Sequence, residues 1–212
     1  MSSLKLAICR EIKTMNYRIL LIFAVLLAGC TALQAPKVEN THTYLLEARP
    51  VIVTDSKKST QILAISQPVS RSGYDTPQMA YQRLPLELEY FASHRWADTP
   101  AHMLKPLLLQ TLAPNFSAVV ATPGTIAANL RLDTELIRLQ QNFTSKPGQI
   151  QLTLRAQLID LKDKRVIAVK LFDESENTES DDAYGGVKAA NRALQRVLAQ
   201  LAEFCLNPYA SR

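Results

Sequence analysis

One pair of residues in this sequence could do acid–base chemistry. His94 and Asp98 are four positions apart, and a carboxylate that orients a histidine is how many hydrolases hold a general base. The alternative is a packing corner, in which Trp96 lies between a strand and the following helix with its N–H satisfied. We favour the corner, because His42 and His102 add no spacing typical of a catalytic or zinc-binding motif.

Two other features could bind ions, and each has a simpler interpretation. Six acidic residues lie between Asp173 and Asp182, but their spacing differs from that of an EF-hand calcium loop. We expect a solvated loop that could contact a basic partner. Tyr184-Gly185-Gly186 could offer backbone N–H groups to an anion, although a flexible turn into a helix is the favoured interpretation. Glycine-rich phosphate loops and serine-nucleophile motifs are missing, so we predict no catalytic residue, metal site or cofactor.

The residues that precede Cys30 give the clearest indication of a chemical modification in this sequence. Ten uncharged apolar residues, Ile19–Ala28, precede it, and basic residues lie further upstream. A spanning helix needs roughly 20 apolar residues, whereas the apolar region of a secretory leader needs roughly 7–15. Leu27-Ala28-Gly29-Cys30 resembles the bacterial lipobox, in which the first three residues are recognised by the signal peptidase. This resemblance implies cleavage before Cys30 and attachment of acyl chains such as palmitate to it.

The leader sets the boundaries that we predict. Residues 1–29 are expected to be a lipoprotein signal peptide, residues 30–42 a lipidated tether and residues 43–212 a single domain. Translation could begin at Met1 or at Met15, because both starts leave a basic residue ahead of the apolar run. Three acyl chains exceed the two lipid signals that stable attachment requires, so the mature chain needs no transmembrane helix. The alternatives are an ordinary cleaved leader or a structural cysteine in a buried helix.

Charge and cysteine content indicate a domain without reactive thiols or a nucleic-acid surface. The chain carries a net charge of +5, but residues 1–29 contain four bases and one acid, and their removal leaves +2. No basic patch then argues for nucleic acid. Cys9 falls in the leader and Cys30 would be lipidated, so Cys205 has no internal disulfide partner. Its place on the apolar face of a predicted helix favours a core position.

Short strands are expected in the first half of the domain, at residues 43–48, 61–69 and 83–92. The last of these has the clearest pattern, because apolar residues alternate with Glu87 and Glu89. Its predicted buried face comprises Leu84, Leu86, Leu88 and Tyr90. A period of two is typical of a half-buried strand, with one face on the core and the other in solvent.

A helix follows these strands and a second helix closes the chain. The first is capped by Asp98 or Thr99 and has apolar residues at helical spacing as far as Leu112, although Pro106 predicts a kink or a late start. Further strands are expected at 117–121, 129–143, 149–160 and 165–173, and the last three form an antiparallel meander. An apolar stripe from Val187 to Cys205 predicts the closing helix. These elements indicate a mixed sheet covered by helices.

With these elements in place, the chain resembles the ABC-type transport auxiliary lipoproteins. The resemblance rests on Tyr44-Leu45-Leu46 soon after the lipid cysteine, on Tyr74-Asp75 and on Trp96 before the helix. It implies a three-layer α/β domain with a mixed, partly antiparallel sheet and covering helices, including a long C-terminal helix. It also implies no enzymatic activity, and it makes Tyr44, Leu45, Tyr74 and Trp96 structural or docking positions. Pro106 and the dense acidic segment depart from the family pattern.

The same resemblance implies service to a lipid transporter between bacterial membranes. The partners would be an MCE (mammalian cell entry) protein with its ABC permease and ATPase, and copies of the chain can form a homo-oligomeric ring. An aspartate after the lipid cysteine would indicate retention at the inner membrane. Thr31 stands there instead, so the periplasmic face of the outer membrane is expected. Two rival functions are a lipoprotein pilot for an outer-membrane secretion complex and a periplasmic hydrolase that uses His94 and Asp98.

Overall fold

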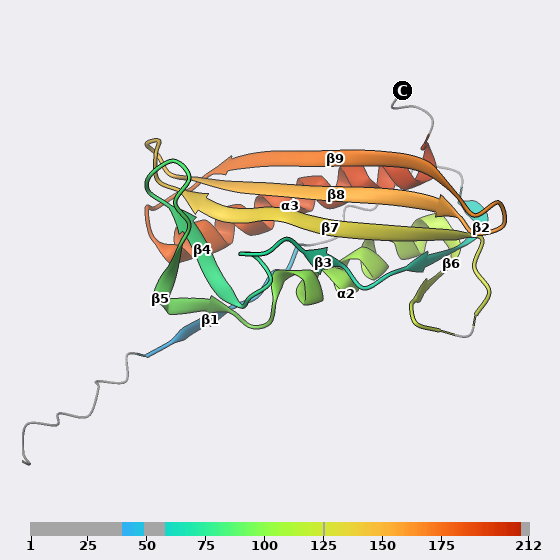
Figure 1. Ribbon diagram of the computed structural model, residues 1–212, viewed down its shortest axis with the longest axis horizontal. Coiled ribbons are helices and arrows are strands. Elements are labelled where there is room, and N and C mark those ends of the chain that lie inside the picture. The colour runs from blue at the N-terminus through green and yellow to red at the C-terminus, as the bar shows by residue number, and fades with distance from the viewer. Residues whose placement is uncertain (1–39, 49–57, 125, 209–212) are drawn as a thin grey trace, which may run out of the picture. The chain divides into compact units, whose positions relative to one another are not determined.

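Residues 40–48, 58–124 and 126–208 are described by the computed structural model of the chain (Figure 1). The predicted leader and its lipobox residues Leu27, Ala28, Gly29 and Cys30 lie outside these residues. A compact unit begins at Thr41, so all described residues after Asn40 belong to it.

A mixed sheet of nine described strands forms the framework of this unit. The strands are β1 (His42–Tyr44), β2 (Ser59–Ile65), β3 (Val69–Ser70), β4 (Gln78–Gln82), β5 (Glu89–Trp96), β6 (Phe116–Ala121), β7 (Leu130–Asn142), β8 (Gln149–Asp160) and β9 (Arg165–Asn177). β7 is the hub, because β2, β3 and β4 pair with it in parallel while β8 pairs with it antiparallel. β9 continues the antiparallel part, β6 pairs with β2, and β5 lies between β4 and β1.

Two helices cover the sheet, and both begin at a side chain that caps them. α2 (Pro100–Leu112) starts after Thr99, whose hydroxyl accepts a hydrogen bond from the His102 N–H. α3 (Ala183–Leu206) starts after Asp182, whose carboxylate accepts one from the Gly185 N–H at 2.7 Å. These caps satisfy N–H groups that a helix start otherwise leaves unpaired. The late start considered at Pro106 is wrong, since α2 begins at Pro100 and continues through that proline. A short 3-10 helix, η2 (Ala113–Asn115), joins α2 to β6.

The core lies where the two helices meet one face of the sheet. Along β7 every second residue from Leu130 to Leu136 is buried, which is the alternation that a sheet with one covered face requires. Leucines from α2, α3, β7 and β8 come together in this layer: Leu104, Leu194, Leu136 and Leu152. The predicted mixed sheet, its antiparallel meander and the long C-terminal helix are therefore confirmed.

The predicted strand at 83–92 is wrong in its first half. β4, which the sequence pattern missed, ends at Gln82, and residues 83–88 form a turn before β5 starts at Glu89. The Glu87 N–H donates to the Leu84 carbonyl at 3.3 Å and closes this turn around Pro85 and Leu86. Alternating leucines and glutamates therefore imitate the period of a strand, but the leucines face solvent.

The acidic segment also differs from the prediction. β9 extends to Asn177, so only residues 178–182 form the connection to α3. Gly185 lies in the first turn of α3 rather than in a flexible turn, and a Cβ there would lie 2.3 Å from the Ser180 carbonyl oxygen. Close approach of the helix to this connection is therefore the reason that a glycine is needed. The predicted strand at 43–48 is also shorter, since β1 ends at Tyr44.

Candidate functional site

The signature residue Tyr44 lies at the edge of the sheet, in a cluster of aromatic rings. β1 pairs in parallel with β5, and His42 lies beside His94 in this register. The His94 ring stacks on the rings of His42 and Tyr44, with centroids 5.0 and 5.8 Å away. The Tyr44 Oη lies 3.0 Å from His94 Nδ1, and Tyr184 at the start of α3 tilts toward Tyr44 at 6.2 Å. Burial, with the negative charge of Asp182, raises the pKa of Tyr44, so its hydroxyl stays protonated.

The candidate acid–base pair is not brought together. His94 contacts Tyr44, whereas the Asp98 carboxylate accepts from the Thr99 N–H at 2.6 Å and lies 3.2 Å from His102 Nδ1. Both side chains are exposed: Asp98 just precedes the cap of α2, and His102 lies on its first turn. Trp96 is buried in the core, as the packing interpretation expects, and its backbone N–H donates to the Pro77 carbonyl at 2.7 Å.

A groove adjoins the aromatic cluster along α2, and the signature residue Leu45 lies on its wall. This docking groove has a volume of about 440 Å³ and is lined by Leu45, Leu46, Glu47, Ala48, Met103, Pro106, Leu107 and Gln110. Leu45 is 52% exposed although it is apolar, while its neighbour Leu46 is buried. Pro106 has no N–H, so it adds an apolar surface to the helix without leaving an unpaired donor.

Asn191, in the middle of α3, fixes the chain that forms this wall. Its Oδ1 accepts from the Glu47 N–H at 2.6 Å, and its Nδ2 donates to the carbonyls of Leu45 and Val187 at 3.3 and 3.0 Å. The segment after β1 thus has its backbone groups satisfied by a helix side chain instead of a neighbouring strand. The sequence offered one signal for this role. Asn191 lies four residues after Val187 and three before Leu194, so it places a polar side chain beside the apolar stripe of the helix.

The signature residue Tyr74 lies apart from the docking groove, above the outer face of the sheet. Its hydroxyl donates to Gln140 Oε1, and Gln140 Nε2 donates to the side-chain oxygens of Gln82 and Gln151 at 3.0 and 3.2 Å. Burial raises the pKa of Tyr74, so it remains a donor at neutral pH. The network fixes Tyr74 and the loop that carries it to β7, which indicates a structural role.

Acidic and basic residues form a charged seam between β9 and α3. Arg192 Nε lies 2.7 Å from Glu176, and Arg196 contacts Glu174 at 2.9 Å and Glu176 at 2.8 Å. Burial alone would raise the pKa of Glu176, but the hydrogen bonds from Arg192 and Arg196 outweigh it and lower that pKa. The expected solvated loop is thus wrong for these acids, which are neutralised within the domain.

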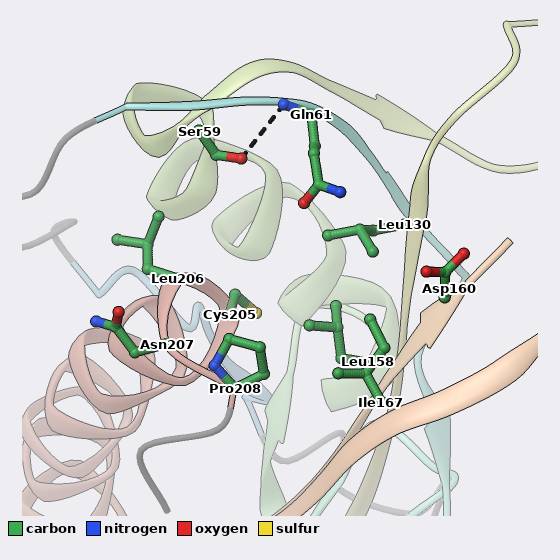
Figure 2. Close-up of a pocket in the computed structure, with 10 residues that line it drawn as sticks. All are labelled: Ser59, Gln61, Leu130, Leu158, Asp160, Ile167, Cys205, Leu206, Asn207 and Pro208. Atoms are coloured by element: carbon green, nitrogen blue, oxygen red, sulfur yellow. Dashed lines mark hydrogen bonds between the residues drawn. The ribbon is translucent and has the colours of Figure 1, made fainter. Parts of the chain in front are cut away.

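A cavity of about 390 Å³ opens at the C-terminal end of α3 (Figure 2). Figure 2 shows Cys205 turned toward Leu158 and Leu130 of the strands, while Gln61 and Asp160 lie at the polar part of the lining. Cys205 is buried as predicted, and burial raises the pKa of its thiol well above the ordinary value. A thiol that remains protonated is a poor nucleophile.

Two properties of the described residues bear on chemistry and on membrane contact. Residues 40–48, 58–124 and 126–208 hold no group of three or more histidine, cysteine or acidic side chains placed to bind a metal ion. Within that part of the chain, neither helix combines the length and the apolar character needed to cross a bilayer.

Comparison with known proteins identifies the family. Residues 44–202 match the ABC-type transport auxiliary lipoprotein component family. The crystal structure of protein XCC0632 from Xanthomonas campestris is similar in fold, with a TM-score of 0.73 and 20% identity over 78% of this chain and 95% of that one. The hypothetical protein CT253 from Chlamydia trachomatis matches with a TM-score of 0.50 and 10% identity over 73% and 100% of the two chains. No curated protein sequence matches. The chain belongs to the ABC-type transport auxiliary lipoprotein component family.

Proposed function

We propose that this protein is the auxiliary lipoprotein of an ABC transport system that moves lipid between bacterial membranes. Acyl chains on Cys30 hold it at the periplasmic face of the outer membrane, and an MCE-domain protein with its permease and ATPase is the partner. Membership of the auxiliary lipoprotein family supports the transport role. Threonine at position 31, in place of an aspartate, supports the outer membrane.

The docking groove at Leu45 is the observation that supports a binding role for the domain. An apolar side chain that is half exposed, on a wall held in place by Asn191, presents a preformed surface to a partner. Such a surface binds with little loss of conformational entropy. Confinement by the lipid tether raises the effective concentration near the membrane, so a contact of modest affinity suffices.

A ring of copies is the second part of the proposal. In the described residues β9 pairs only with β8, so its other edge has backbone groups available for a neighbouring chain. Three apolar side chains of this strand are exposed: Val166, Val169 and Leu171. Native mass spectrometry of the protein tests this, and Val169→Lys is expected to lower the number of copies per assembly. An unchanged assembly, or a monomeric parent protein, would contradict the ring.

Crosslinking from the groove tests the docking function. A photoreactive amino acid at position 45 should capture an MCE-domain protein in cells, because Leu45 is exposed on the wall of the docking groove. The same amino acid at Ile126, which is similarly exposed at 60%, is the control and should capture none. Capture of a secretin from position 45 would favour the pilot function instead. Mass spectrometry of the mature N-terminus separately tests whether Cys30 carries acyl chains.

A further inference from the structure

The β4–β5 turn, residues 83–88, exposes leucines at its tip. Leu84 is 61% exposed and Leu86 is fully exposed, while Leu88 is partly covered. Single exposed apolar residues are common on soluble domains, but a contiguous apolar group marks an interaction site. We call residues 83–88 the leucine turn.

Leu86 has a backbone conformation that favours a different residue type. Pro85 and Leu86 are the central residues of a turn closed from Glu87 to Leu84, and the φ of Leu86 is 68°. A positive φ in the second central position is typical of a type II turn, which favours glycine or asparagine there. A leucine in this backbone conformation is strained, and its side chain gains no burial in return. The position therefore favours a side chain that contacts something outside the domain.

The leucine turn rests on a second turn, which gives it a firm base. A Cβ added to Gly73 would lie 3.0 Å from Leu88 Cδ2, so the two turns are in close contact. The Tyr90 hydroxyl donates to the Gly73 carbonyl at 2.9 Å. Gly73 has a φ of 91°, which a larger residue would adopt only with strain. Leu84 and Leu86 are thus presented on a supported projection.

Aromatic rings lie directly behind the turn. Tyr81 packs against Phe91 at 4.6 Å and against Phe143 at 5.9 Å between ring centroids. The guanidinium of Arg83 lies 4.9 Å above the Tyr81 ring. Tyrosine beside an apolar tip, with an arginine that can reach phosphate, is the side-chain composition found at the boundary between lipid headgroups and acyl chains.

The pairing of β1 with β5 keeps the start of the domain near the leucine turn. β5 begins at this turn, and β1 runs parallel to its last three residues, with His42 beside His94. Glu89 and His94 are five residues apart, and because β5 bulges between its pairs with Ala80 and Gln78, they are separated by at most roughly 17 Å. The tether from Cys30 to His42 reaches at most about 40 Å. A tether of this length lets the turn touch the surface in which the acyl chains are embedded.

We propose that the leucine turn inserts Leu84 and Leu86 into the surface of the lipid bilayer and orients the tethered domain on it. This inference rests on the proposed lipid anchor at Cys30. Arg83 is the one base in residues 83–89, against the acids Glu87 and Glu89, so insertion is driven by apolar contact and does not require anionic lipid. Each inserted leucine raises the affinity for the surface about tenfold, which orients a domain that the acyl chains already hold.

Fluorescence quenching in vesicles tests the proposal on the mature lipidated protein. An environment-sensitive label is attached at Leu86→Cys, because buried Cys205 does not compete for it. In phosphatidylcholine vesicles with quenchers on the acyl chains, we expect at least half of its fluorescence to be lost. Ile126 is also apolar and exposed, and it lies just before the start of β7, whereas the leucine turn follows β4 at the other end of β7. A label at Ile126→Cys should therefore keep its fluorescence. Adding phosphatidylglycerol should change neither result.

A second variant separates insertion from damage to the fold. With the label at Leu84→Cys, the change Leu86→Gly should reduce quenching several-fold without lowering the midpoint of thermal unfolding. Flotation with vesicles reports the anchor independently. Protein that floats but shows no quenching at position 86, or equal quenching at 86 and 126, would overturn insertion and leave the anchor standing. Protein that fails to float would overturn the anchor and, with it, the insertion.

Discussion

The side chains of the charged seam contact one another within the domain, whereas those of the leucine turn are exposed to solvent. At the seam, acids of β9 and arginines of α3 are paired within the domain and partly covered, so charge contributes to cohesion. At the turn, Leu84 and Leu86 stand in solvent, and the backbone of Leu86 is strained. The seam closes the interior, and the turn presents apolar surface outward. The comparison shows that the position of a segment in the fold, more than its composition, decides whether its side chains are used inside or outside.

The seam depends most on the close approach of α3 to the connection before it. Gly185→Ala places a Cβ against the Ser180 carbonyl oxygen, and backbone cannot move away as a flexible side chain can. We expect a loss of about 3 kcal/mol in the free energy of unfolding, measured by chemical denaturation. Gly186→Ala, which meets the side chain of Gln141, should cost less. Equal costs would show that the approach is looser than the structure indicates.

The ion pairs of the seam should contribute a smaller amount. Glu176→Gln removes the charge that Arg192 and Arg196 share and should lower the free energy of unfolding by about 1 kcal/mol, since solvent reaches both arginines. Glu203→Gln, at an exposed position of α3, is the control and should change the free energy of unfolding little. If the two variants behave alike, the seam contributes no net stability.

Acidification should remove the contribution of these carboxylates. The pKa of Glu176 is lowered in the folded protein, and a hydrogen bond from Thr153, aided by Arg138, lowers that of Asp173. Because the unfolded chain then binds more protons than the folded one below about pH 4.5, stability is present above that pH and is lost as the pH falls through the lowered values. Denaturation curves between pH 7 and pH 3 measure this. The difference between wild type and Glu176→Gln should shrink over the same range.

Substitution in the leucine turn should give the smallest change in stability, and this change should be an increase where the substitutions at the seam give a decrease. Leu86→Gly relieves the positive φ and should raise the free energy of unfolding by about 0.5–1 kcal/mol, because no buried contact is lost. Leu86→Ala retains the strain and should give no such gain. A loss of stability on either change would mean that Leu86 packs within the domain and would remove the contrast with the seam.

Hydrophobic period predicted the long elements of the fold well. The meander of β7, β8 and β9 and the closing helix α3 have patterns of nine residues or more, and each was found within a few residues of the expected bounds. The helix after Trp96 was predicted from its cap and its apolar spacing, even with Pro106 inside it. Long runs are predictable because one wrong residue does not alter their period.

Short segments were predicted poorly, for a physical reason. Leucines and glutamates alternate from Leu86 to Glu89, and this pattern fits a strand as well as it fits the turn found here. Only the pairing of β4 with β5 shows that these residues form a turn. The acids of β9 were assigned to a loop because the arginines that neutralise them lie on α3, 16 to 22 residues along the chain. The role of Asn191 depends on contacts with Leu45 and Glu47, more than 140 residues away. Partners this distant cannot be identified from one sequence.

The parallel pairing of β1 with β5 has a mechanical consequence for a protein tethered by its N-terminus. A pull along β1 acts across its hydrogen bonds to β5, including the bond from the Ala97 N–H to the Tyr44 carbonyl at 2.7 Å. These bonds are loaded together in shear and do not peel open one after another. The Asn191 contacts with Leu45 and Glu47 then pass the load to α3, the longest helix described. Drag on the domain is therefore spread through its core and does not unravel the end that the proposed lipid anchor would hold.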